Sequence, residues 1–419
     1  MNGYYTYTLK NGLRIILRPS SNQVVYCGYQ IAAGTRDELF GEEGMAHFCE
    51  HMTFKGTERR NALQIINGLE QLGGDLNAFT NKEDTTFYAA IQKEHIAKAI
   101  SLLTDIVFNS TYPQHEIDKE VEVICDEIES YNDSPAELIY DEFENLLFEG
   151  HPLGHNILGQ ADQLRTYKTE DALRFVRSNY RPDNAVFFIY GNVEFKNVVK
   201  LVEKAINQTT PNPSYSGGEP NTTVLPLSRG SQRGSEQSNT ITREIGSHQA
   251  HVMIGTKAYD IHHPMRIALY LLNNILGGPG MNARLNLALR ERNGLVYTVE
   301  STMVSYSDTG MWSIYFGCDP HDINKCLKLV RRELDKVMQK PLSANALFTA
   351  KQQLKGQIAI ACDNREQFAL DFGKSFLHYG WEKNVDKLFE SIDKVTADDI
   401  QKVANELFAT DKLKTLIFK

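Results

Sequence analysis

Several features that would mark particular classes of protein are missing from this sequence. The 419 residues include six cysteines, but these form no C-x-x-C pair and no dense framework. A disulfide-stapled secreted domain and a cysteine-ligated zinc site are therefore not expected. The cysteines fit reduced thiols with packing roles in a cytoplasmic compartment, and they lie at Cys27, Cys49, Cys125, Cys318, Cys326 and Cys362.

Long apolar runs and an excess of basic charge are also missing. No apolar run approaches the roughly 18 residues that span a bilayer, and the N-terminus lacks a basic segment followed by an apolar one. The formal net charge is −9, so neither nucleic acid nor an anionic membrane is an expected partner. These features predict a soluble, cytoplasmic protein.

The chain length predicts more than one domain, because single hydrophobic cores stop growing at about 250 to 300 residues. Hydrophobic residues make up 42% of the chain and charged residues 23%, which is ordinary for a globular protein. A stretch rich in Pro, Gly, Ser and Asn divides the sequence nearly in half. We expect domains at 1–208 and 240–419, joined by a linker at 209–239.

Hydrophobic periodicity predicts a similar series of elements in both halves. In the first half, after a hairpin within 1–20 around an Asn-Gly turn, strands are expected at 24–34, 85–92 and 184–193, and helices at 44–54, 61–73, 95–109, 114–132, 135–149 and 169–179. In the second half, strands are expected at 251–259, 295–306 and 310–318, and helices at 264–278, 283–294 and 323–340. The strand, turn and helix of 85–107 match those of 310–334 in order. The predicted fold is α+β, with two similar domains that each pack helices on a mainly antiparallel sheet.

The pentapeptide "HFCEH" carries the first chemical signal. On a helix, His47 and His51 are one turn apart on one face, and Glu50 projects close to that face. Two imidazoles can ligate one cation, and a carboxylate beside them can accept a proton from water. This order inverts the common H-E-x-x-H zinc helix. Two histidines with this spacing also occur by chance on ordinary helices, so a metal site requires a third ligand elsewhere.

The acidic helix at 114–132 offers candidates for that third ligand. Glu120 and Glu127 are two helical turns apart and share a face. The candidates in full are Glu120, Glu122, Asp126, Glu127 and Glu129. The ordinary alternative for such a helix is a solvated acidic face.

A series of motifs in order resembles the inverted-zincin family of mitochondrial processing peptidase, pitrilysin and insulin-degrading enzyme. The motifs are "LKNGLRIIL", "AAGTRDE", "GMAHFCEHMTFKGT", "LNAFTNKEDTTFY", "EVEVICDEIESYNDSP", "HPLGHNILG" and "YRPDNAVFFIYGNV". With the second half, the resemblance covers nearly the whole chain. It implies one Zn²⁺ per chain, ligated by His47, His51 and Glu127, because the family's third ligand follows the second histidine by about 76 residues. Glu120 matches the family's second acidic residue, which supports the site.

The resemblance also implies a mechanism of peptide hydrolysis. Zinc would polarise the scissile carbonyl and lower the pKa of a water molecule, and Glu50 would transfer the proton to the leaving amine. In the second half, Arg290 and Tyr297 have the R-x6-Y spacing of a pair that stabilises the family's transition state. The alternative for these two residues is a surface ion pair for Arg290 and packing in the sheet for Tyr297.

The number of domains leads to a prediction about assembly. In single-chain relatives the Arg and Tyr come from a fourth domain, whereas this chain has two, so a homodimeric clamshell with a shared active site is expected. Asn77, Ala78 and Phe79 match the family's edge strand, to which extended peptide adds. We therefore expect a zinc metalloendopeptidase acting on unfolded or short polypeptides. One alternative is a non-catalytic subunit, which would be expected to lack a ligand or Glu50; this chain retains both. Another is an obligate heterodimer with a separate partner, in which the zinc motif and the Arg–Tyr element are divided between two chains; this chain contains both elements.

Overall fold

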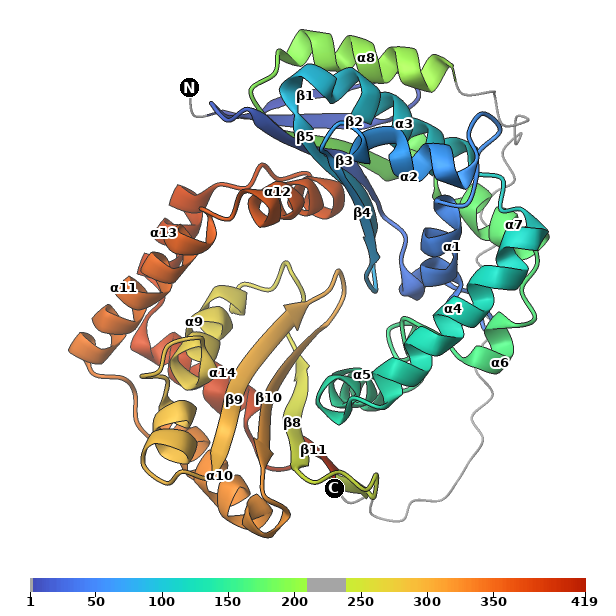
Figure 1. Cartoon of the computed structure of the whole chain (residues 1–419). Coiled ribbons are helices and arrows are strands. Elements are labelled where there is room, and N and C mark those ends of the chain that lie inside the picture. Colours follow the sequence, from blue (N-terminus) through green and yellow to red (C-terminus); the bar gives the residue numbers. More distant parts are fainter. Residues whose placement is uncertain (1–2, 209–238) are drawn as a thin grey trace.

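The chain forms two α+β halves built around separate β-sheets (Figure 1). The computed structural model describes residues 3–208 and 239–419, so all but the last residue of the predicted linker lies outside the described residues. The first sheet has the order β1 (Tyr5–Thr8), β2 (Arg14–Pro19), β6 (Ala185–Gly191), β3 (Val24–Ile31), β5 (Thr85–Gln92) and β4 (Asp75–Thr80). The second has the order β7 (Thr240–Arg243), β11 (Lys414–Phe418), β8 (Ala250–Ala258), β10 (Gly310–Cys318) and β9 (Val296–Ser305).

The two sheets share one topology. The pair β2–β6 is parallel, as is β7–β11, and the pairs that follow are antiparallel in both sheets. Strands β2 to β6 of the first sheet correspond, in chain order, to strands β7 to β11 of the second. Within the described residues, strand β1 has no counterpart in the second sheet, and it pairs with β2 to form the predicted N-terminal hairpin. The α+β fold with two similar, mainly antiparallel domains is confirmed.

Over residues 3–208, the first half contains the six predicted helices and, in addition, two that the sequence did not predict, at 161–164 and 195–207. The helices of this half are α1 (Met45–Thr53), α2 (Ala62–Glu70), α3 (Ile96–Asn109), α4 (Gln114–Asn132), α5 (Pro135–Leu147), α6 (Ala161–Leu164), α7 (Thr169–Asn179) and α8 (Phe195–Asn207). Local chemistry explains several boundaries. Asn61 accepts a hydrogen bond from the Gln64 amide at the start of α2, and Pro135 occupies the first turn of α5.

The second half contains more helix than the sequence predicted. Its helices are α9 (Arg266–Gly277), the π-helix η4 (Asn286–Glu291), α10 (Ile323–Gln339), α11 (Ala344–Ala361), α12 (Arg365–Tyr379), α13 (Val385–Lys394) and α14 (Ala397–Leu407). The helix expected at 283–294 is thus a π-helix over its central part. No helix among the described residues is long and apolar enough to cross a membrane.

Each half contributes one helix to the sheet of the other half. Helix α5 packs on β8 and β11, where Phe143 lies with Met253 and Leu416 in one buried cluster. Helix α12 packs on β6 and β3, where Phe372 joins Phe188. Figure 1 shows α12 lying beneath the first sheet although it belongs to the C-terminal part of the chain. This exchange holds the two halves together through two apolar cores.

Candidate metal centre

Helix α1 carries the H-x-x-E-H motif and is fixed at its N-terminus. Gly44 precedes it with φ of +90°, a left-handed conformation that favours glycine, and a Cβ there would lie 2.8 Å from the Gly159 Cα. The Glu38 carboxylate accepts hydrogen bonds from the amides of Gly44 and Ala46, at 3.0 and 2.8 Å. An anion at this end also complements the helix dipole. These contacts fix where the histidines of α1 point.

His47, His51 and Glu127 converge, as the sequence predicted. The His47 Nε2 lies 3.9 Å from Glu127 Oε1, and the His51 Nε2 lies 3.4 Å from Glu127 Oε2. One ligand atom from each of the three residues falls within 4.8 Å of the others. Glu127 comes from α4, so packing of α4 on α1 brings together residues 76 positions apart. This geometry is suited to a single cation with two nitrogen ligands and one oxygen ligand.

Glu120 contacts the same group from behind His51. Its Oε1 lies 3.1 Å from His51 Nδ1, and its Oε2 pairs with Lys55 Nζ at 2.5 Å. A carboxylate at Nδ1 leaves the opposite ring nitrogen, Nε2, free to act as a ligand. The structure thus places Glu120 against the His51 ring, on the side away from the ligand group.

Burial and the neighbouring charges shift the pKa values of the three ligand residues. Burial and the neighbouring charge of His51 lower the pKa of His47 to about 4. Burial also opposes charge on His51, but hydrogen bonds with Glu120 and Glu127 raise its pKa to about 9. Hydrogen bonding to His51 lowers the pKa of Glu127 in turn. A cation at the site must displace the His51 proton, because only neutral imidazole acts as a ligand.

Glu50 lies beside the three ligand residues but outside the group they form. Its side chain is buried, with 8% of the residue exposed, and burial raises its pKa. The hydroxyl of Thr80 donates a hydrogen bond of 2.8 Å to Glu50 Oε2 and opposes that rise. A buried carboxylate next to a cation site is placed for proton transfer.

Strand β4 contains the three residues predicted to contact substrate and lies in contact with α1. It is the last strand of the first sheet, and in the described part of the chain β5 alone pairs with it. Asn77, Ala78 and Phe79 pair with Tyr88, Phe87 and Thr86, respectively. Their other edge can accept a further strand. The structure therefore places an open sheet edge next to the ligand group.

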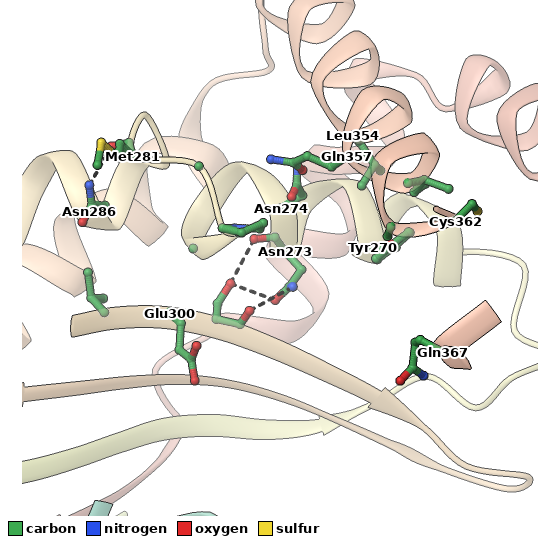
Figure 2. Close-up of a pocket in the computed structure, with 18 of the residues that line it drawn as sticks. Tyr270, Asn273, Asn274, Met281, Asn286, Glu300, Leu354, Gln357, Cys362 and Gln367 are labelled. Carbon is green, nitrogen blue, oxygen red and sulfur yellow. Dashed lines mark hydrogen bonds between the residues drawn. The ribbon is translucent and has the colours of Figure 1, made fainter. Parts of the chain in front are cut away.

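Arg290 and Tyr297 lie together in the second half. The Arg290 guanidinium is 5.5 Å from the centre of the Tyr297 ring, and the Tyr297 residue is 81% exposed, which excludes packing inside the sheet. Both line a cavity of about 660 Å³, which Figure 2 shows between α9, β9 and α11. No hydrogen bond, ion pair or ring contact found among the described residues links either one to the histidine–glutamate group. One chain therefore does not bring the two sets of residues together.

Lys55 and Thr80 are contacts that the sequence analysis missed. Both stand inside motifs that it quoted, "HMTFKGT" and "LNAFT", but neither residue type signals metal chemistry. Their positions follow from the packing of α4 and β4 against α1. Lys55 follows His51 by four residues, about one helical turn, and this spacing is the signal that the sequence offers.

Fold and site together define a class: a duplicated α+β chain carrying the inverted H-x-x-E-H motif with a distant glutamate in reach. A family model described as Insulinase (Peptidase family M16) matches residues 14–161, and one described as Peptidase M16 inactive domain matches 167–354. The chain belongs to peptidase family M16. The two models meet near residue 165, earlier than the linker predicted at 209–239.

Similar proteins from several bacteria match almost the whole chain. The Bacillus subtilis protein named uncharacterized zinc protease YmxG is 31% identical over 98% of this chain and 97% of its own. The Streptomyces coelicolor protein named uncharacterized zinc protease SCO5738 is 32% identical over 96% of this chain and 86% of its own. A crystal structure described as a protease from Helicobacter pylori shares the fold, with a TM-score of 0.88, 21% identity, and coverage of 100% of this chain and 99% of that one.

Proposed function

We propose that this chain is a zinc-dependent endopeptidase. The observation that carries the proposal is the convergence of His47, His51 and Glu127 beside the buried carboxylate of Glu50. Two imidazoles and one carboxylate are a ligand set of catalytic zinc sites. Relatives of similar length named zinc proteases support the same metal.

The site residues divide the work of hydrolysis among them. His47, His51 and Glu127 would hold zinc, which when bound supplies a Lewis acid that polarises a carbonyl and favours ionisation of water. Glu50 accepts the proton of the attacking water and returns it to the leaving amine. Glu120 holds the His51 ring by its Nδ1. Burial keeps the Glu50 carboxylate poorly solvated, which makes it a stronger proton acceptor.

Substrate is proposed to bind as an added strand along β4. Asn77, Ala78 and Phe79 would supply main-chain hydrogen bonds, which recognise an extended backbone with little regard to its side chains. Unfolded or short polypeptides fit this mode of binding, because a folded protein has few free extended segments. We place the activity in the cytoplasm, a proposal supported by six cysteines that form no disulfide.

The active site is proposed to be completed by a second copy of the chain. Arg290 and Tyr297 are exposed, and in the described part of the chain no hydrogen bond, ion pair or ring contact links them to the ligand group. In a homodimeric clamshell they would face the partner's zinc site and stabilise the developing oxyanion. This arrangement gives two active sites in each dimer.

A non-catalytic role is the second candidate. The family model described as an inactive domain matches residues 167–354, so it favours this role for the second half of the chain only. Helix α9 follows β8 in the second half as α1 follows the equivalent strand β3 in the first half. Helix α9 contains no His, Cys, Asp or Glu. The second half therefore lacks ligands where the first half has them. A chain that retains both the ligand group and Glu50 fits catalysis better.

Replacing Glu50 tests the function directly. We expect Glu50→Gln to bind zinc as the wild type does and to cleave peptides at least about a hundredfold more slowly, because the proton acceptor is lost. Zinc is measured by elemental analysis, and cleavage of a peptide library by mass spectrometry. A wild-type rate for the variant contradicts the role of Glu50, and a folded wild-type chain that binds no zinc contradicts the proposed function.

A further inference from the structure

Thr80 is the last residue of β4, and its hydroxyl contacts Glu50 directly. The Thr80 Oγ1 donates to Glu50 Oε2 at 2.8 Å, and the two residues are 9% and 8% exposed. No other hydrogen bond to the Glu50 side chain is found among the described residues. One carboxylate oxygen is therefore occupied by the strand, and the other is free.

The hydrogen bond from Thr80 makes the two carboxylate oxygens of Glu50 unequal as proton acceptors. A hydroxyl that donates to a carboxylate forms a charge-assisted hydrogen bond, which limits rotation of the carboxyl group. Because Oε2 already accepts from Thr80, Oε1 is the more basic oxygen and the better proton acceptor for an attacking water. After Oε1 takes the proton, Oε2 still accepts from Thr80, so the contact need not break during proton transfer.

The backbone at Thr80 is itself firmly held. Thr80 pairs with Thr85 across β4 and β5, and the turn between them is anchored at two side chains. Glu83 binds Arg36 and the Ser307 hydroxyl at 2.6 Å each, and Asp84 pairs with Lys374 at 2.7 Å. Ser307 and Lys374 belong to the second half, so both halves fix the end of β4.

We propose that Thr80 is a positioning residue, which orients the Glu50 carboxylate and couples its placement to the strand that receives the peptide. This inference rests on the proposed function, since Glu50 must be the proton acceptor for its orientation to matter. Peptide that pairs with Asn77 to Phe79 adds to the same strand that ends at Thr80. Strand β4 thus aligns both the bound peptide and the Glu50 carboxylate.

The test compares variants that differ by a single hydroxyl. Thr80→Val keeps the shape of the side chain and loses the donor, whereas Thr80→Ser keeps the donor. Thr85→Val is the matched control, because the buried Thr85 hydroxyl donates to the Ala33 carbonyl and not to Glu50. kcat and KM on a single unfolded peptide, zinc content and thermal unfolding are measured for each purified chain.

We expect Thr80→Val to lower kcat by about ten- to a hundredfold, the effect of losing a hydrogen bond to a charged group. KM and zinc content should stay at wild-type values, and Thr80→Ser should recover kcat to within about threefold. Thr85→Val should keep the wild-type kcat. If Thr80→Val does not fold, Thr80→Ala is compared with Thr80→Ser, and the same difference in kcat is expected.

Three results would overturn the inference: a wild-type kcat without the hydroxyl, equal losses in the serine and hydroxyl-free variants, or a loss of kcat explained by lost zinc. A wild-type chain that binds zinc but cleaves no peptide has a separate meaning. It overturns the proposed function itself, and with it the basis for assigning Thr80 a role in catalysis.

Discussion

At the scale of single residues, His51 uses both ring nitrogens in different ways. Nε2 faces Glu127 with the ligand group, and Nδ1 meets Glu120, which pairs with Lys55. This chain of contacts holds the imidazole in one orientation. Contacts of this kind behind a ligand commonly change metal affinity by about ten- to a hundredfold. Lys55 therefore belongs to the site although it does not reach the ligand position.

The role of Lys55 leads to a prediction about metal affinity. Lys55→Met should weaken zinc binding about tenfold, because Glu120 loses its cationic partner and holds His51 less firmly. Competition with a chelator measures the affinity. Lys119→Met is the control, since the one pairing of exposed Lys119 within residues 3–208 and 239–419 is with Glu116 on the surface of α4. Equal affinities for the wild type and Lys55→Met would contradict the argument.

At the scale of elements, the exchange of α5 and α12 determines how the two halves meet. Each helix buries its apolar side chains on the sheet of the other half, with Phe143 and Phe372 fully buried. Polar contacts reinforce α12 at its C-terminal part, where Lys374 and His378 pair with Asp84 at 2.7 and 3.1 Å. The Asp84 side chain is 1% exposed, so this contact is shielded from solvent.

Asp84 should make stability depend on pH in the acid range. Burial raises its pKa, but the hydrogen bond from His378 and the charge of Lys374 outweigh burial and hold the pKa well below the usual range. The folded state then binds fewer protons than the unfolded one, so this stabilisation is full above about pH 4 and is lost as pH falls further.

Asp84→Asn should accordingly lower the free energy of unfolding by about 2 kcal/mol at pH 7 and flatten its decline below about pH 4. Urea unfolding at several pH values provides the measurement. Asp411→Asn, at an exposed position, is the control and should follow the wild-type profile. If all three proteins lose stability in parallel below about pH 4, Asp84 does not carry the effect.

At the scale of the whole molecule, the two sets of predicted site residues lie in different halves. The loop after β9 contacts the first half through Asp308 and Arg36. Tyr297 lies near the opposite end of β9, eight residues before Ser305, which amounts to about 26 Å along a strand. This separation supports a partner chain, and not a fold-back within one chain, as the source of the Arg–Tyr pair.

A shared site predicts that two inactive variants restore each other. Glu50→Gln and Tyr297→Phe should each be nearly inactive alone. In a mixed dimer, one of the two sites combines the intact Glu50 of one chain with the intact Tyr297 of the other. Random mixing makes about half of the dimers mixed, so about one quarter of wild-type activity should be recovered. Native mass spectrometry confirms that mixed dimers have formed. Mixed dimers without recovered activity would contradict the shared site.

Local patterns were enough to locate much of the site. His47 and His51 share a helix face because four residues make about one turn, and Glu120 and Glu127 do so because seven make about two. Alternating strands and amphipathic helices likewise predicted the duplicated fold. The resemblance to known peptidases then selected Glu127 among five acidic candidates, which spacing alone left open.

Tertiary packing decided what those patterns could not. Strands β7 and β11, with four and five residues, were not predicted, and neither were helices α6, α8 and α11 to α14. A short strand carries little pattern of its own and depends on its partners in the sheet. The exchange of α5 and α12 leaves no local trace, because an apolar helix face does not name the sheet that covers it. For the same reason the contact between Thr80 and Glu50, thirty residues apart, emerged only when β4 was placed against α1.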